Sequence, residues 1–238
     1  MKTKIMFSFG SLLLIGSIFF LCSNSVNAKN NCYYVNNNGI CMTEDNYNNL
    51  LSLDFAEDEI ANMLIDMFNE NKDLSGQIVA ETTNYYLDTY FYNLGSVSTS
   101  STLVTETQYN NFIPLSSYNN SNLRGHDGYI ETTAKKMHTT ITLVGSHYRY
   151  KNRVEWKTMP SKRSYDIIGI GLESSKVYAS SNINYMLTYC TDSINCTSST
   201  TAIIQNFGAG VSSTFKLPTG TYVKMYAVLY YDISKNSG

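Results

Sequence analysis

Three histidines stand close together in the sequence and could supply a general base or bind a metal. They are His126, His138 and His147, and imidazole is the usual group with a pKa near neutrality. His138 and His147 are expected in adjacent strands, so they can meet across a hairpin, with Asp127 or Glu131 near enough to orient one. Three histidines in the basic part of a β domain are more often ordinary polar surface residues. We therefore expect no metal site here.

A second candidate is the carboxylate pair Glu155 and Asp166, which flanks Trp156 and resembles the acid and base of a glycosidase. Two carboxylates near an aromatic residue are common by chance. Trp156 is the only tryptophan, and it fits a core position between two sheets or, alternatively, a platform for a sugar ring. Tyr148 and Tyr150 are the other candidate binding residues. The common hydrolase, zinc and calcium motifs are absent, so we assign no catalytic residue, metal or cofactor.

Four cysteines follow the N-terminal leader: Cys32, Cys41, Cys190 and Cys196. An even number of cysteines in an exported chain favours disulfides, and three pairings are open. Proximity in the sequence favours Cys32–Cys41 and Cys190–Cys196, with free thiols as the alternative. The close pairs of ligands that a zinc site needs are absent.

The first 28 residues have the pattern of a secretory signal peptide. Lys2 and Lys4 precede an apolar run that ends at Cys22, and small residues at Val26 and Ala28 favour cleavage after Ala28. An uncleaved membrane anchor is the alternative. No later apolar run approaches bilayer length, so we expect a secreted or extracellular protein with no stable membrane span after cleavage, and association with the cell wall stays open.

Charge is scarce and unevenly placed. Only 15% of residues are charged, against about 25% in an average soluble protein, which argues against a disordered tail, a coiled coil or a basic nucleic-acid-binding protein. Loss of Lys2 and Lys4 with the leader leaves 15 basic against 19 acidic residues, a net charge of −4. Nine acids and one lysine lie between Cys41 and Asp73, whereas Arg124 to Arg163 holds nine bases and three acids. This separation of charge is typical of two solvent-exposed faces of opposite sign, but it also lets the two segments attract each other.

Residues 29–76 are expected to form a small acidic helical module. Thr43, followed by two acids, fits the start of a short helix, and Asp54 fits the start of a second, with Phe55 at the elbow. An apolar stripe with helical spacing follows, at Ile60, Met63, Leu64, Met67 and Phe68.

From Gln77 onward the apolar period changes from 3.6 to 2. Nine strand-like runs are expected: 77–92, 102–109, 129–144, 148–157, 164–172, 182–190, 200–207, 212–217 and 221–233. Ser96 to Asn122 is rich in Ser, Thr and Asn and is expected to be a surface excursion or linker. We therefore predict a mainly β chain, with an antiparallel β-sandwich or jelly-roll-like domain over residues 77–238 after the small helical hairpin.

Three stretches of the sequence resemble segments of other proteins. They are Asn38 to Ile60, Trp156 to Ile170, and Phe215-Lys-Leu-Pro. Together they resemble uncharacterised secreted proteins of Gram-positive (Firmicutes-type) bacteria, in which a glycine often stands where this chain has Asp54. The resemblance implies export and the fold class, and it implies no activity.

These observations favour a secreted or cell-surface protein without evident catalysis, whose partner is an extracellular glycan, a protein or a cell-wall component. The alternative is a secreted hydrolase that uses the His126/His138/His147 cluster or the Glu155/Asp166 pair. A secreted toxin-like factor is a further alternative. No nucleic acid is expected as a partner.

Overall fold

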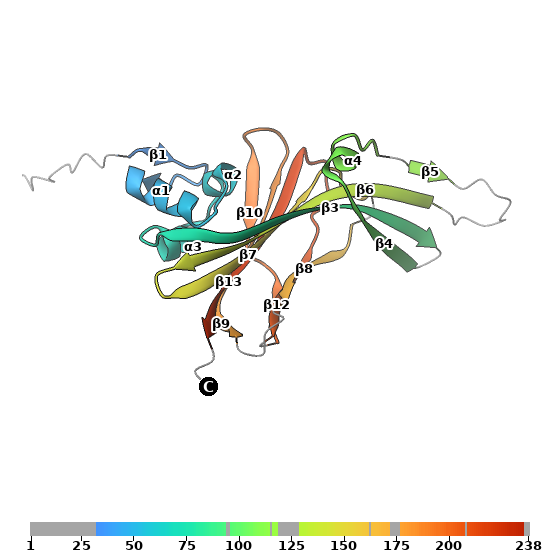
Figure 1. Cartoon of the computed structure of the whole chain (residues 1–238). Helices are drawn as coiled ribbons and strands as arrows, with labels where there is room; N and C mark the ends of the chain where they lie inside the picture. Colours follow the sequence, from blue (N-terminus) through green and yellow to red (C-terminus); the bar gives the residue numbers. More distant parts are fainter. Residues whose placement is uncertain are drawn as a thin grey trace, which may run out of the picture. The chain divides into compact units, whose positions relative to one another are not determined.

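Antiparallel β-sheets make up most of the chain, and a small helical segment precedes the long strands (Figure 1). The predicted fold class is confirmed. The structure, a computed structural model, describes residues 32–93, 96–114, 116–118, 129–161, 163–171, 177–207 and 209–235. The predicted signal peptide, residues 1–28, lies outside these residues. All described residues belong to one compact unit, and the predicted boundary between residues 76 and 77 falls at the start of its first long strand.

The helices in the described residues are short. They are α1 (Glu44–Ser52), α2 (Glu57–Ala61), α3 (Ile65–Asn71) and α4 (Glu106–Asn110).

Within the described residues the strands form three sheets, and neighbouring strands are antiparallel. They are β1 (Tyr34–Val35), β2 (Cys41–Met42), β3 (Gly76–Asn93), β4 (Ser96–Val104), β5 (Ser116–Tyr118), β6 (Tyr129–Val144), β7 (His147–Trp156), β8 (Tyr165–Gly171), β9 (Val177–Cys190), β10 (Cys196–Ser199), β11 (Ile203–Asn206), β12 (Gly210–Lys216) and β13 (Lys224–Lys235). The large sheet runs β10-β9-β13-β7-β6-β3-β4, with β5 beside β6. A smaller sheet runs β11-β12-β8, and β1 pairs with β2.

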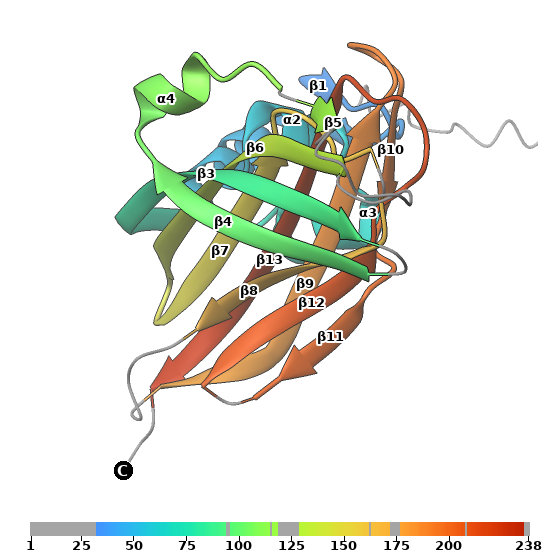
Figure 2. The same ribbon diagram turned by 90° about the vertical axis from the view of Figure 1, so that its right-hand side faces the viewer.

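Strand β13 shows how the sheet separates two cores. Tyr226, Val228 and Tyr230 pack with the apolar side chains of α1–α3. The residues that pack toward the three-stranded sheet are Met225, Ala227, Leu229, Tyr231 and Ile233. Successive side chains of a strand point to opposite faces, so this alternation places helices on one face and the smaller sheet on the other. Figure 2 shows β8, β12 and β11 on the side away from α1–α3.

The start of α1 follows the prediction. Thr43 caps the helix, since its hydroxyl accepts the Asn46 N–H at 3.2 Å while the Asn46 side chain accepts the Thr43 N–H at 3.3 Å.

The predicted second helix is divided in two. The apolar stripe from Ile60 to Phe68 is interrupted between α2 and α3, where Asn36 Nδ2 donates to the carbonyl of Met63 at 2.9 Å. Asn38 Nδ2 donates to the carbonyl of Asn62 at 3.1 Å, so side chains replace the missing helical partners of these carbonyls. The predicted start at Asp54 is wrong, because Asp54 has a φ of 66°, and α2 begins after Ala56.

The segment from Ser96 to Asn122, expected to be a surface excursion or a linker, contains regular structure. Its described part forms β4, α4 and β5, and β4 pairs along nine residues with β3. Strand β4 consists of Ser, Thr, Val and Leu, so it lacks the alternation that predicts a half-buried strand. The predicted strand over 102–109 is therefore partly wrong, because Thr105 caps α4 there.

Both predicted disulfides are present. Cys32 bonds Cys41, and Cys190 bonds Cys196 between β9 and β10, where the two residues are direct partners in the ladder. Within the described residues, no helix is long and apolar enough to cross a membrane.

We expect Cys190→Ser/Cys196→Ser to lower the free energy of unfolding by about 2 kcal/mol, because a short closed loop restricts the unfolded chain only modestly. Urea unfolding of the variant and the wild type measures the difference. A loss above about 5 kcal/mol would show that this bridge holds more than its hairpin.

Candidate functional site

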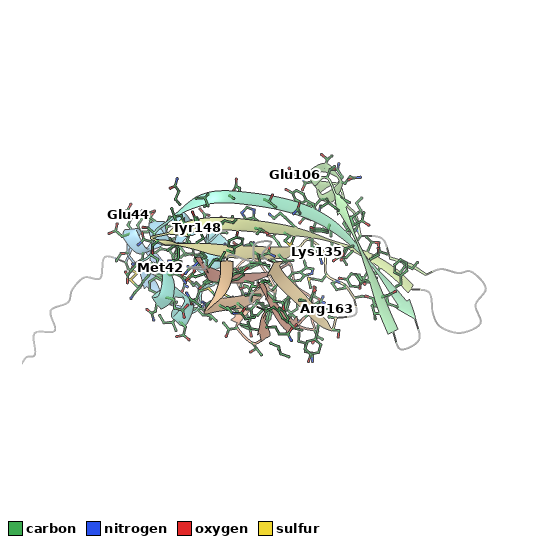
Figure 3. All side chains as sticks on the ribbon, turned by 60° about the horizontal axis from the view of Figure 1, so that its bottom comes forward. Met42, Glu44, Glu106, Lys135, Tyr148 and Arg163 are labelled. Carbon is green, nitrogen blue, oxygen red and sulfur yellow. A yellow bond between two sulfur atoms is a disulfide. The ribbon has the colours of Figure 1, made fainter. Side chains whose placement is uncertain are left out.

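One cavity lies between the β3–β4 hairpin and β8, and we call it the cleft. Its volume is about 600 Å³. Its polar and aromatic lining includes Asp88, Tyr90, Lys135, Arg163, Tyr165 and Asp166. Strand alternation explains the first wall, since Asp88 and Tyr90 lie two apart on β3 and pair with Ser101 and Thr99 of β4. Figure 3 shows Lys135 and Arg163 at this end of the sheet.

Asp88 is the most deeply buried charged group of the cleft. Its side chain is 2% exposed and contacts Lys135 Nζ at 2.6 Å, while the Ser101 hydroxyl donates to its Oδ1 at 2.5 Å. A buried carboxylate needs such partners, because desolvation of an unpaired charge is costly. The ion pair also fixes the Lys135 ammonium beside the opening of the cleft.

Asp166, on β8, is the second carboxylate of the cleft. Its Oδ1 accepts the N–H of Ile167 at 2.8 Å, and no hydrogen bond to its Oδ2 is found within the described residues. Burial raises the pKa of Asp166, the charge of Asp88 adds to this effect, and Lys135 and the Ile167 N–H oppose it. The two carboxyl groups of the cleft therefore differ in environment.

Aromatic rings and a guanidinium form the rim. Tyr165 is 66% exposed, whereas Tyr90 is half-buried and stacks on Tyr92 with ring centroids 6.3 Å apart. Arg163 is held in place by the Pro218 carbonyl, which accepts from its Nη1 at 2.8 Å, and by the ring of Tyr222. The rim thus presents flat apolar faces next to fixed polar groups.

A smaller cavity of about 80 Å³ adjoins the cleft, because Lys135 and Asp166 line both. Trp156 also lines it, and this side chain is only 4% exposed. The indole Nε1 is buried without a hydrogen-bond partner among the described residues. The edge-on packing of Trp156 against Phe215 fits the predicted core position between two sheets.

His138 and His147 do not come together. His138 Nε2 lies 3.6 Å from Asp54 Oδ2 and its Nδ1 lies 2.8 Å from the Thr83 hydroxyl, whereas His147 contacts Asp232 at 3.5 Å. In the β6–β7 ladder, His138 is opposite Arg153 and His147 is opposite Val144, six residues farther along β6. His126 lies outside the described residues, in which no cluster of metal-ligating side chains is found.

Glu155 and Asp166 are not brought together either. Glu155 accepts from Arg153 Nη2 at 2.9 Å, on the face of the sheet that carries the helices. Asp166 shares a cavity with Trp156 on the opposite face. Because Glu155 and Trp156 are successive residues of β7, their side chains point to opposite faces. Asp88, not Glu155, is the carboxylate that shares the cleft with Asp166.

Tyr148 and Tyr150 lie outside the cleft. Both are partly buried and pack against the apolar side chains between the two sheets, and Tyr150 stacks on Tyr231 with centroids 6.1 Å apart. Figure 3 shows Tyr148 toward the helical end, away from Lys135 and Arg163. The structure thus gives both tyrosines packing contacts.

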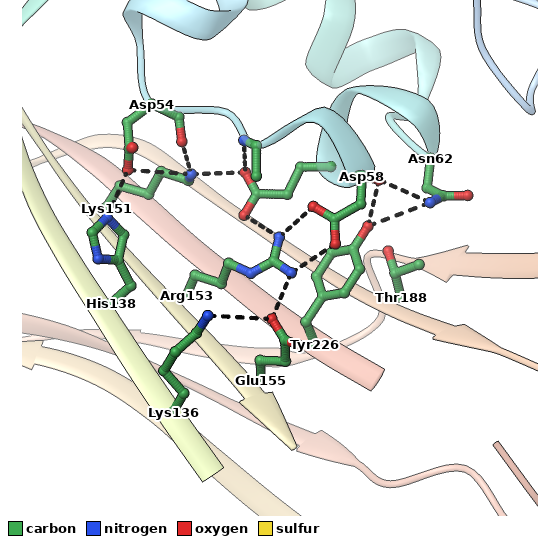
Figure 4. Close-up of polar contacts among 12 residues, drawn as sticks. Asp54, Asp58, Asn62, Lys136, His138, Lys151, Arg153, Glu155, Thr188 and Tyr226 are labelled. Carbon is green, nitrogen blue, oxygen red and sulfur yellow. Dashed lines mark hydrogen bonds and ion pairs between the residues drawn. The ribbon is translucent and has the colours of Figure 1, made fainter. Parts of the chain in front are cut away.

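The acidic helical segment and the basic strand β7 contact each other through an ion-pair network (Figure 4). Glu59, which is fully buried, contacts Lys151 at 2.7 Å and Arg153 at 3.0 Å. Arg153 also binds both carboxylate oxygens of Asp58, each at 2.7 Å. The separation of acidic and basic residues along the sequence therefore reflects attraction between the helical segment and β7. These side chains contact one another and do not form two separate solvent-exposed faces.

Asp54 extends this network to β6. Its Oδ2 accepts the Thr140 hydroxyl at 2.8 Å, and Lys151 Nζ donates to its main-chain carbonyl. Burial opposes ionisation of Asp54, but His138, Lys151 and Thr140 together hold its pKa below the usual range. The charged groups of the network bind one another, so the network joins the helical segment to the sheet. The cleft is therefore the candidate site.

Sequence reasoning identified Asp166 and missed the other polar residues of the cleft. Asp88 and Lys135 lie in two different long strands, and no fixed spacing relates them to Arg163 or Tyr165. The available signal was weak: Asp88 is the one charged residue in an otherwise uncharged run of β3 from Thr82 to Asn93.

Comparison with protein-family models, with curated proteins and with solved structures finds no match.

Proposed function

We propose that this protein is an extracellular binding protein without catalytic activity, and that its ligand is a glycan held in the cleft. The observation that carries the proposal is the lining of the cleft, where Tyr165 and Tyr90 stand beside Asp166 and Arg163. Aromatic rings provide flat faces for the C–H surfaces of a sugar, and charged or amide groups bind its hydroxyls.

Two further features support export and a binding role. The disulfides Cys32–Cys41 and Cys190–Cys196 are of the kind that persists in oxidising compartments. The volume of the cleft, about 600 Å³, falls in the range of small-molecule sites and accommodates a short oligosaccharide segment. The proposed membership among secreted Gram-positive proteins and cleavage after Ala28 accord with this role.

We expect Tyr165→Ala to weaken glycan binding about tenfold, because one aromatic contact contributes about 1–1.5 kcal/mol. Tyr165 is largely exposed, so its loss should leave folding nearly unchanged. A glycan array identifies the ligand, and titration calorimetry compares the wild type with the variant. Tyr33→Ala is the matched control, since Tyr33 is 58% exposed and does not line the cleft.

Two results would count against this function. One is the absence of glycan binding by the residue 29–238 chain across the array. The other is binding that Tyr165→Ala and Tyr33→Ala affect equally, which would place the glycan outside the cleft.

A second candidate is a glycan hydrolase that uses Asp166 with Asp88. The specific observation in its favour is the difference between these carboxyls, since burial raises the pKa of Asp166 while Asp88 forms an ion pair with Lys135. Such a difference is the pattern of a general acid beside an ionised partner. Turnover of the bound glycan that disappears in Asp166→Asn would establish the hydrolase in place of the binding protein.

A further inference from the structure

Strand β4 ends the large sheet with an edge that no described strand covers. The sheet runs β10-β9-β13-β7-β6-β3-β4, so the main-chain groups of β4 that point away from β3 have no partner strand among the described residues. Residues 97–103 of β4 are all exposed. Figure 2 shows β4 at the border of the sheet, with β3 as its neighbour.

Helix α4, which follows β4, does not cover this edge. Its Tyr109 packs on Tyr85 of β3 with ring centroids 5.0 Å apart. The Tyr109 carbonyl accepts from Lys157 Nζ at 2.7 Å, just beyond the end of β7. Because β3 and β7 lie on the same side of β4 in the strand order, these contacts hold α4 over the sheet and away from the outer edge of β4.

Strand β4 lacks the features that usually keep sheet edges from pairing with another chain. Its sequence, Ser-Val-Ser-Thr-Ser-Ser-Thr-Leu-Val, has no charged residue and no proline, and its nine residues pair with β3 without a register shift. The other terminal strands of the two larger sheets are shorter, since β10 and β11 have four residues each and β8 has seven. Strand β4 therefore offers a long, uncharged edge for another strand.

The order of residues in β4 makes this edge complementary to itself. An antiparallel pair of β4 strands with a two-fold axis at Ser100 uses the whole strand, because Ser100 is its central residue. In that register Val97 lies opposite the partner's Leu103, and opposite side chains point to the same face. Val97 and Leu103 are the exposed large apolar residues of β4, at 56% and 63%, so the pairing brings both into contact.

Charge does not oppose the pairing of two copies. The nearest charged residue after β4 is Glu106, and in the two copies it would lie at opposite ends of the paired strands. Because both copies use the same edge, the contact closes at two copies and does not continue into a fibre.

We propose that the protein forms a two-fold symmetric dimer in which the β4 strands of two copies pair antiparallel about Ser100 and join their large sheets. Val97, Thr99 and Ser101 line the cleft, and opposite side chains share a face, so both clefts open on the same face of the joined sheet. A glycan with repeated units can then engage both clefts. The dimer itself does not depend on glycan binding.

Sedimentation velocity of the residue 29–238 chain, over a dilution series and without glycan, measures the dimer. The wild type should change from one copy to two as its concentration rises. Ser100→Lys and Ser100→Asp each place two like charges opposite each other at the axis, and each should weaken dimerisation about tenfold. An equal mixture of these two variants should restore the dimer, because lysine then faces aspartate.

Ser98→Lys is the matched control for the charge. Ser98 is exposed, lies on the same face of β4 as Ser100 and would pair with the partner's Thr102, so the added lysine meets no like charge. This variant should dimerise as the wild type does. Circular dichroism establishes that each variant is folded.

Three results would overturn the proposed dimer. One is a wild type that remains a single copy at its highest soluble concentration, which would leave the edge to a strand of a different protein. Another is a dimer that Ser100→Lys and Ser100→Asp leave unchanged, or that their mixture does not restore. The third is equal weakening by Ser98→Lys, which would exclude an axis at Ser100. The glycan array tests the proposed function separately, since none of these measurements uses a glycan.

Discussion

Replacing Arg153 with methionine is expected to lower the free energy of unfolding by about 3–5 kcal/mol, because removal of one partner leaves buried charges uncompensated. The Arg153 guanidinium contacts Glu59, Asp58 and Glu155, and its side chain is 9% exposed. Glu59 is fully buried and would keep only Lys151 as a charged partner. The guanidinium also lies 4.1 Å from the centre of the Tyr226 ring, and this contact would be lost as well.

The matched control is Lys136→Met, which removes a more exposed cation from the same region. Lys136 is 36% exposed and lies 4.0 Å from Glu155, so we expect a loss below about 1 kcal/mol. Urea unfolding at pH 7 measures both variants. A loss below about 1 kcal/mol for Arg153→Met would show that water or repacking compensates the acids, and that the network contributes little to stability.

A companion variant tests whether uncompensated charge is the cause. Arg153→Met combined with Glu59→Gln removes both the cation and its fully buried anion. If the buried charge is the main cost, the double variant should be more stable than Arg153→Met alone. If the packing of the Arg153 stem dominates, the second substitution should add to the loss.

The strands could be predicted because their side-chain alternation is local. In β13 the alternation of Met225, Ala227 and Leu229 with Tyr226 and Val228 assigns each residue to the correct core. The helix after Phe55 was less predictable, because its apolar stripe continues across the break. Its carbonyls at Asn62 and Met63 are bound by Asn36 and Asn38, and these contacts depend on the tertiary fold.

The candidate site depended on information that is not local. Asp166 was identified, but it was paired with Glu155, the carboxylate next to Trp156 in the sequence. Alternation alone argues against that pair, since Glu155 and Trp156 must face opposite sides of β7. Its actual neighbour in the cleft, Asp88, lies on β3. Strands β3 and β6 are adjacent in the large sheet, but β8 belongs to the smaller sheet, so only the tertiary fold brings all three to one cavity.

Asp54 shows how one position can combine backbone and charge requirements. Its φ of 66° lies in the left-handed region that favours glycine. The side chain contributes contacts to Thr140, His138 and Lys151 that glycine cannot make. The sequence pattern therefore marks Asp54 as a polar position, but it assigns this residue the wrong role, because Asp54 does not begin a helix.

Acidification from pH 5 to pH 2 is expected to reduce the free energy of unfolding through the carboxylates of the ion pairs. Burial opposes ionisation of Asp58, but Arg153 and Lys224 outweigh it and hold its pKa well below the ordinary value of 3.8. Arg149 and Asn182 similarly outweigh burial and lower the pKa of Asp232, and Asp54 is lowered by its own partners.

The sign of the effect follows from these directions. A carboxyl whose pKa is lower in the folded state contributes stability above its unfolded pKa, and this contribution is lost as the pH falls below about 4. Asp58 alone should account for about 2 kcal/mol, a figure reduced for its 24% exposure. Asp166 acts in the opposite direction, because its raised pKa makes protonation favour the folded state.

Urea unfolding at pH 5, 4, 3 and 2 measures this dependence, and Asp58→Asn isolates the main contributor. The variant should be less stable than the wild type at pH 5 but lose about 2 kcal/mol less on acidification, because it has no carboxyl to protonate at this position. Asp73→Asn removes an exposed carboxylate outside the network and should keep the wild-type pH dependence. Parallel pH profiles for the wild type and Asp58→Asn would contradict the assignment of the acid-sensitive stability to the Asp58–Arg153 pair.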